Sequence, residues 1–197
     1  MFSLSKFSPT ITDMIRFDHS HVLVTFHQYI NTAKTSVKKA LAETICDALE
    51  IHATLEEEIF YPALRRLDNS TVLQKSEPEH MEMRHFISEL RQTKANNAHH
   101  DELLHALMRD VMHHVADEET VLLAQAERLL GQDRLSELGA QMTGRRLELL
   151  KPKAGKIAKN TALGFSGSTT AIVVGFAGAL VAARLVSKHT PELSTRH

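Results

Sequence analysis

Apolar residues recur every three or four positions over most of the first 150 residues, which is the spacing of helices with one buried face. The first run predicts a helix over 9–33 that opens at Ser8-Pro9 and carries a stripe of regularly spaced residues: Ile11, Ile15, His19, Val22, Phe26 and Ile30. A second run predicts a helix over 36–67. Within it, Pro62 is expected to cause a kink or an early end, because proline cannot donate a helical hydrogen bond.

Three further helices follow from the same pattern. The third is expected to be capped by Ser76, with Pro78 in its first turn. The fourth runs over about 101–130 and stops at Gly131. A shorter amphipathic helix then ends near Pro152. Because four long helices joined by short loops form an up-down-up-down bundle, the predicted fold class is all-α, with an extra C-terminal helix.

The pattern divides the chain into a helical bundle over 8–131, an accessory amphipathic helix over 132–150, a basic linker over 151–161 and an apolar segment over 162–186. The stretch 162–183 has no charged residue and is long enough to cross a bilayer, for which about 20 residues suffice. Basic residues precede it, which favours a cytoplasmic location for the preceding chain: Arg145, Arg146, Lys151, Lys153, Lys156 and Lys159.

We therefore expect a cytoplasmic domain that a transmembrane helix anchors to the inner face of the cell membrane. A Gly/Ala-rich helix in a cytoplasmic protein is the alternative.

Composition narrows the classes of function. The formal net charge is −1, so there is no electrostatic reason to expect a nucleic-acid partner. Cys46 is the only cysteine, which excludes an intramolecular disulfide and suits a reducing compartment. Histidine is unusually abundant, with 13 residues against 8 glycines. Because imidazole is a common metal ligand, this excess directs attention to a metal site.

A weak internal repeat relates the second and fourth helices. In each, a histidine is followed four residues later by a glutamate: His52 by Glu56, and His114 by Glu118. Residues four apart lie on one face of a helix, so each pair can present a nitrogen and a carboxylate to one site. Both pairs lie on the apolar stripe, where an unpaired charge would be very costly. Buried carboxylates beside buried imidazoles usually bind a metal.

His19 and His80 fall on the apolar stripes of the other two helices. In an antiparallel bundle, the depth of His19 agrees with that of the two repeated pairs to within about 10 Å. His80 fits only if the third helix starts higher in the bundle than Ser76. We expect these side chains to converge on one metal site formed by His19, His52, Glu56, His80, His114 and Glu118.

The sequence resembles the hemerythrin-like, cation-binding HHE domain over about 10–130. The resemblance rests on Asp18-His19 in the first helix and on the phrases IHATLEEEIFYPAL, EPEHMEMRHFISEL and VMHHVADEE in the next three. It implies that the six residues bind two non-haem iron ions, with Glu56 and Glu118 as bridges alongside an oxo or hydroxo bridge. Many relatives have a fifth histidine ligand, for which this sequence offers no good candidate.

A ferritin-like site built from Glu77–His80 and Glu102–His105 is a competing interpretation. It fails because these pairs open helices at opposite ends of the bundle, roughly 30 Å apart. Tyr61 is a candidate hydrogen-bond donor to a metal ligand. Other polar residues are expected on the surface or in a loop: Glu57, Glu58, Asp117, Glu119, His99, His100 and His105.

Three functions remain open. Each iron would keep an open position for a small ligand such as O₂, NO or peroxide. The protein is then a binding protein for O₂ or NO in storage, sensing or stress response; an iron-dependent oxidoreductase that acts on peroxide or repairs nitrosative damage; or an iron-binding or iron-sensing domain without gas chemistry. The sequence indicates no particular protein partner.

Overall fold

The computed structural model describes residues 9–30, 34–67 and 70–165, and every regular element within these ranges is helical. The elements, in order, are α1 (Ile11–Ile30), α2 (Thr35–Leu55), the π-helical turn η2 (Glu56–Phe60), α3 (Tyr61–Arg65), α4 (Thr71–Gln92), α5 (Ala98–Asp117), the π-helical turn η3 (Glu118–Leu122), α6 (Leu123–Leu129), α7 (Gln132–Leu150), the 3₁₀ turn η4 (Lys151–Lys153) and α8 (Ala154–Gly164). The all-α prediction is confirmed.

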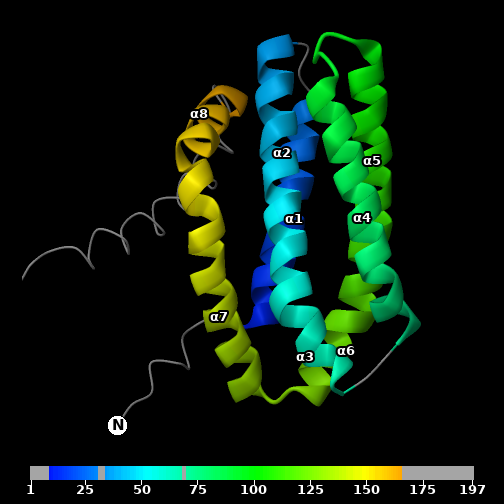
Figure 1. Ribbon diagram of the computed structural model, residues 1–197, viewed down its shortest axis with the longest axis vertical. Helices are drawn as coiled ribbons and strands as arrows, with labels where there is room; N and C mark the ends of the chain where they lie inside the picture. Colours follow the sequence, from blue (N-terminus) through cyan, green and yellow to red (C-terminus); the bar gives the residue numbers. More distant parts are fainter. Residues whose placement is uncertain (1–8, 31–33, 68–69, 166–197) are drawn as a thin grey trace, which may run out of the picture.

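Four helical columns form the bundle (Figure 1). They are α1, then α2 continued by η2 and α3, then α4, then α5 continued by η3 and α6. Helix α1 packs on α2, and α4 packs on α5. Helix α7 lies along α1 and α2, and α8 packs chiefly on α2, so these two helices cover one side of the bundle.

Helix α4 starts earlier than predicted. Its cap is Ser70, whose hydroxyl accepts a hydrogen bond from the backbone N–H of Leu73 at 3.3 Å. Ser76 and Pro78 therefore lie inside the helix, where the sequence had placed its start. The added turn is stabilised because Leu73 is fully buried in the core. The consequence is that His80 lies in the third turn of α4, which supplies the depth that the predicted start did not.

Pro62 neither ends nor sharply breaks the second column. The π turn η2 precedes it, and the helix continues as α3. In that turn the N–H of Tyr61 bonds to the carbonyl of Glu56, five residues back. The turn η3 has the same form, with Leu123 bonded to Glu118, yet no proline follows it. The π turns therefore coincide with the two glutamates and not with the proline.

The core consists of two apolar clusters with a polar layer between them. One cluster lies toward α3 and α6 and includes Ile15, Leu55 and Leu122. The other lies toward the opposite end and includes Val22, Leu49 and Val111. Each column thus passes from one apolar cluster to the other through the level at which its histidines and glutamates lie.

Residues 151–161, expected to form a basic linker, belong instead to η4 and α8. Lys153 and Lys156 pair with acidic residues of α2, including the buried Asp47 at 2.9 Å from each. Phe165, just after α8, is buried in the core. These contacts hold the segment against the bundle.

The predicted membrane segment 162–186 begins within α8, and from residue 166 onward it lies outside the described residues. Among the helices that the structure describes, none combines the length and apolar character needed to cross a membrane.

Candidate metal centre

The six residues predicted from the sequence lie together in the polar layer, and none is more than 4% exposed. They form two groups whose potential ligand atoms lie within 4.8 Å of one another. One group contains His19, His52, Glu56 and Glu118, and the other contains Glu56, His80 and His114. Glu56 belongs to both groups, so the two candidate metal positions are adjacent.

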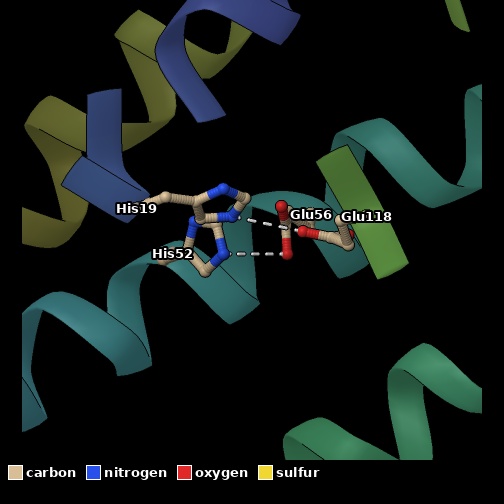
Figure 2. A group of neighbouring side chains, drawn as sticks. All are labelled: His19, His52, Glu56 and Glu118. Carbon is tan, nitrogen blue, oxygen red and sulfur yellow. Dashed lines mark ion pairs between the residues drawn. The ribbon is translucent and has the colours of Figure 1, made fainter. Parts of the chain in front are cut away.

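Each glutamate lies between histidines of the two groups. Glu56 Oε2 is 3.2 Å from His52 Nε2 and 3.3 Å from His80 Nε2. Glu118 Oε2 is 3.3 Å from His19 Nε2 and 3.5 Å from His114 Nε2. Figure 2 shows the first group, with the rings of His19 and His52 directed toward the two carboxylates. All four imidazoles thus direct Nε2 inward, and both glutamates occupy positions from which one carboxylate can reach two metal ions.

The π turns begin at these two glutamates. A π turn widens a helix locally by one residue, and such turns are frequent at functional sites. The fully buried Glu56 and Glu118 both enter the polar layer from this widened backbone. The two repeated motifs therefore share the same local backbone structure, a π turn that begins at the glutamate.

A second ring of carboxylates surrounds the imidazoles. The Nδ1 atoms of His19, His80 and His114 lie 2.9, 2.9 and 2.8 Å from the nearest acidic oxygen, and that of His52 lies 3.5 Å away. These outer carboxylates are, in the same order, Glu119, Glu57, Glu79 and Asp18. Such partners fix the tautomer and orientation of a metal-binding imidazole.

The outer ring connects the columns in a closed cycle. Each outer carboxylate is the sequence neighbour of one predicted ligand and contacts a histidine on the next column. Asp18, beside His19, faces His52 on α2, and Glu119, beside Glu118, returns to His19 on α1. The prediction of a solvated helix face is confirmed for Glu119, which is exposed, but Glu57 is only partly exposed, and each of the two also contacts a histidine of the site. Their signal in the sequence was an acidic residue directly beside one proposed ligand in each of the four columns.

Tyr61 contributes a hydroxyl to the centre of the site. It donates to Glu118 Oε1 at 2.9 Å or to Glu56 Oε2 at 3.1 Å, and lies 3.3 Å from His80 Nε2. Burial and the two carboxylates raise the pKa of Tyr61 well above its usual value, so the phenol stays protonated. This position agrees with the predicted role as a hydrogen-bond donor to a metal ligand.

The pKa values of the buried glutamates and histidines are shifted in opposite directions. Burial and the charge of Glu118 raise the pKa of Glu56 well above its usual value. Burial would also raise the pKa of Glu118, but the close contact with His19 and the other nearby imidazoles lower it. Burial lowers the pKa of His52 to about 4, whereas Glu118 outweighs burial at His19 and raises its pKa to about 9. In the absence of metal, Glu56 therefore favours its protonated form, whereas the imidazoles stabilise the carboxylate of Glu118.

The donor set fits divalent or trivalent metal ions. Several buried atoms that face inward lack a hydrogen-bond partner of good geometry: His19 Nε2, His52 Nε2, Glu56 Oε1 and Glu118 Oε2. Leaving buried polar atoms unsatisfied is costly. Imidazole nitrogen with carboxylate oxygen is a ligand set that suits iron among the transition metals. A bound metal pair would satisfy these atoms and neutralise the carboxylates.

Three histidines outside the site lie apart from the predicted ligands, at the start of α5. His99 and His105 are exposed, as predicted. His100 is buried, which corrects the prediction of a loop or surface position, and its Nδ1 lies 3.2 Å from the Tyr29 hydroxyl. Tyr29 also donates to Asp101. This group lies at the far end of α1, away from the metal ligands.

Comparisons with known proteins identify the family of this chain. A curated relative from Nostoc sp. (strain PCC 7120), described as a DNA nickase, is 23% identical over 146 residues. The aligned part covers 74% of this chain and 42% of the relative, so the chain spans less than half of that protein. No solved structure matches significantly. The family described as the hemerythrin HHE cation binding domain matches residues 10–126, which include all six predicted ligands. The chain therefore belongs to the hemerythrin HHE cation-binding family.

Proposed function

We propose that this protein binds two non-haem iron ions and uses them to bind a small ligand such as O₂ or NO. The observation that carries the proposal is the placement of Glu56 and Glu118, each between one histidine of each group. One metal would be held by His19 and His52 and the other by His80 and His114. Glu56, which belongs to both groups, and Glu118, which contacts His19 and His114, would be shared. That set leaves each iron short of six ligands.

The surroundings favour a small, weakly polar ligand. Apolar clusters close the polar layer above and below, with Ile15, Leu55 and Leu122 on one side and Val22 and Val111 on the other. Iron held in such a layer supplies reversible binding of O₂ or NO, together with one-electron redox chemistry. The chain's own residues exclude bulk water, fix the imidazoles through the outer carboxylates and hold a proton on the Tyr61 hydroxyl.

A second candidate, turnover of peroxide, is favoured by Tyr61. Its phenol lies among the ligand atoms rather than outside them. A buried hydroxyl at that place can give a proton to a bound ligand, which simple storage does not require.

Iron content is the first test. We expect about two irons per chain in the wild-type protein, and strong loss of iron in Glu56→Ala and His114→Ala. His105→Ala is the matched control, because His105 lies on α5 with His114 but is exposed. A wild-type iron content well below one per chain, or equal loss in the control, contradicts the proposal.

Spectroscopy separates the functions. The iron-loaded protein is reduced without air, and optical spectra are recorded after addition of O₂, NO or peroxide. A stable new spectrum supports ligand binding, and continued consumption of peroxide supports the oxidoreductase. Absence of any change with all three supports an iron-binding or iron-sensing role alone.

The name of the Nostoc relative calls for one further measurement. Four basic residues of the C-terminal helices pair with carboxylates of the bundle, so this side gives no support for a basic groove for DNA: Arg145, Arg146, Lys153 and Lys156. Supercoiled plasmid incubated with the iron-loaded protein tests nicking directly. Nicking by the wild type but not by Glu56→Ala would place DNA among its substrates.

A further inference from the structure

Helix α7 lies beyond residues 10–126, the part of the chain that the family matches. It nevertheless reaches the metal centre through Arg146. We infer that Arg146 is a positioning residue: it fixes Asp18, which orients His52, and so sets how tightly the half of the site with His19 and His52 holds its metal. The inference rests on the proposed function, because it requires a metal at that position.

The contacts form a short chain from α7 to the site. Arg146 Nη1 donates to Asp18 Oδ1 and Nη2 to Asp18 Oδ2, both at 2.5 Å, in a two-point clamp. Asp18 Oδ2 is also the oxygen nearest to His52 Nδ1. The side chains of Asp18 and Arg146 are 13% and 20% exposed, so solvent screens their pairing only in part. One oxygen therefore serves both the guanidinium and the imidazole.

His52 is the exception among the four histidines. Its Nδ1 lies 3.5 Å from Asp18, whereas the other three lie within 2.9 Å of their carboxylates. At that distance Asp18 makes an electrostatic contact with His52 but no hydrogen bond of good geometry. The two short bonds from Arg146 thus hold Asp18 in place more firmly than His52 does. The orientation of the His52 imidazole therefore depends on where Arg146 of α7 holds the Asp18 carboxylate.

The position of α7 along α1 is itself fixed at three levels. At the first, Gly139 allows the helix to approach so closely that an added Cβ would lie 2.3 Å from the carbonyl oxygen of Pro9. At the second, the Thr143 hydroxyl contacts the sulfur of Met14 at 3.4 Å. At the third, Arg146 meets Asp18. The two helices run parallel in this register, so Arg146 cannot slide relative to Asp18 without breaking the first two levels.

The other half of the site has a comparable clamp within the bundle. Arg84 on α4 binds both oxygens of Glu57 at 2.8 and 2.9 Å, and Glu57 lies 2.9 Å from His80 Nδ1. Each half therefore has one histidine whose outer carboxylate an arginine holds. In the half that contains His52, that arginine lies on a helix outside the family match.

Arg145 provides the matched control. It is the sequence neighbour of Arg146 and also forms a two-point pair, at 2.7 and 3.0 Å, but with the exposed Glu58. Its pair thus joins α7 to η2 in the second column, without touching an outer carboxylate of the site. A general weakening of α7 should affect both arginine variants, whereas a positioning role belongs to Arg146 alone.

The experiment loads the full chain with Fe(II) under argon and follows release of iron to an excess of ferrozine. In Arg146→Gln, we expect one of two release phases to become about tenfold faster, the lower end of the effect typical for outer partners of metal ligands. In Arg145→Gln, both phases should match the wild type. In Arg84→Gln, the other phase should accelerate. Mössbauer spectra of ⁵⁷Fe-loaded Arg146→Gln should show one altered iron and one unaltered iron.

Further variants test the route and allow for misfolding. Adding Arg146→Gln to Asp18→Ala should give no further acceleration, because the arginine acts through Asp18. If Arg146→Gln does not fold, Arg146→Lys is compared with Arg145→Lys, since lysine keeps the charge but loses the two-point clamp. Equal release from the Arg146 and Arg145 variants, equal acceleration of both phases or full additivity with Asp18→Ala overturns the inference. A wild-type protein that holds no iron overturns the proposed function as well, so the two failures are distinguishable.

Discussion

At the scale of single residues, Tyr61 is the polar group most closely surrounded by the predicted ligands. Tyr61→Phe removes only the hydroxyl, so we expect iron content to stay near that of the wild type. The metal-free protein should lose about 1–3 kcal/mol of unfolding free energy, because a hydrogen bond to a charged carboxylate disappears. Urea denaturation in the presence of EDTA measures the loss. Iron loss as strong as in Glu56→Ala would instead make Tyr61 a metal ligand.

Cys46 has a testable dependence on pH. Burial raises the pKa of its thiol to about 12, from an ordinary value near 9. The folded state therefore keeps the proton where the unfolded state loses it, and unfolding free energy should fall as pH rises from about 9 toward 12, by at most about 1.4 kcal/mol per pH unit. Denaturant titrations at several pH values check this slope. Cys46→Ala should show a shallower slope, and equal slopes would contradict the assigned burial.

The residues also show what a sequence can and cannot predict about such a site. The His52–Glu56 and His114–Glu118 spacing was informative because helical geometry converts it directly into a shared face. The role of the outer carboxylates was harder to predict from the sequence, because a glutamate such as Glu57 or Glu119 on a helix usually faces water. Their role depends on which column lies opposite, and that is a property of the assembled bundle.

At the scale of elements, the helical pattern located every column but misplaced one start and missed both π turns. Ser76-Glu77-Pro78 has the form of a helix start, yet the helix begins almost two turns earlier, where Leu73 is buried. The π turns leave no periodic signal, since they insert a single extra residue into a helix that otherwise continues. Both errors concern local choices that tertiary packing decides.

Gly139 and Gly144 give a matched test of how α7 docks. A Cβ at Gly139 would lie 2.3 Å from backbone oxygen of Pro9, whereas Gly144 has nothing within 4 Å. We expect Gly139→Ala to lower the unfolding free energy by about 1–3 kcal/mol through this clash. Gly144→Ala should raise it by about 0.5–1 kcal/mol, because alanine favours the helix. Chemical denaturation of both variants checks this, and stabilisation by both would mean that α7 does not pack closely on α1.

At the scale of the whole molecule, the C-terminal region bears on the prediction of a transmembrane anchor. The predicted span begins at residue 162, but α8 includes 162–164 and Phe165 is buried against the bundle. Any span would therefore start later than the charge pattern alone indicates. The anchoring prediction is tested by fractionating cells that produce the full chain or a fragment ending at residue 165. If the prediction is right, only the full chain is found in carbonate-washed membranes. Recovery of both proteins in the supernatant would contradict it.

A second pair of fragments tests whether η4 and α8 belong to the bundle. Asp47 is 2% exposed, and its charge is balanced by Arg91, Lys153 and Lys156. A fragment ending at residue 150 lacks both lysines and Phe165. We expect it to lose about 3 kcal/mol or more of unfolding free energy relative to the fragment ending at residue 165, from lost apolar burial and a poorly compensated buried carboxylate.

Both fragments should still bind about two irons, because all six proposed ligands and Arg146 precede residue 150. Denaturant titrations and elemental analysis of the two fragments give the comparison. Equal stability would show that α8 contributes little to the bundle. Iron loss confined to the shorter fragment would show that the metal centre needs α8 as well as α7.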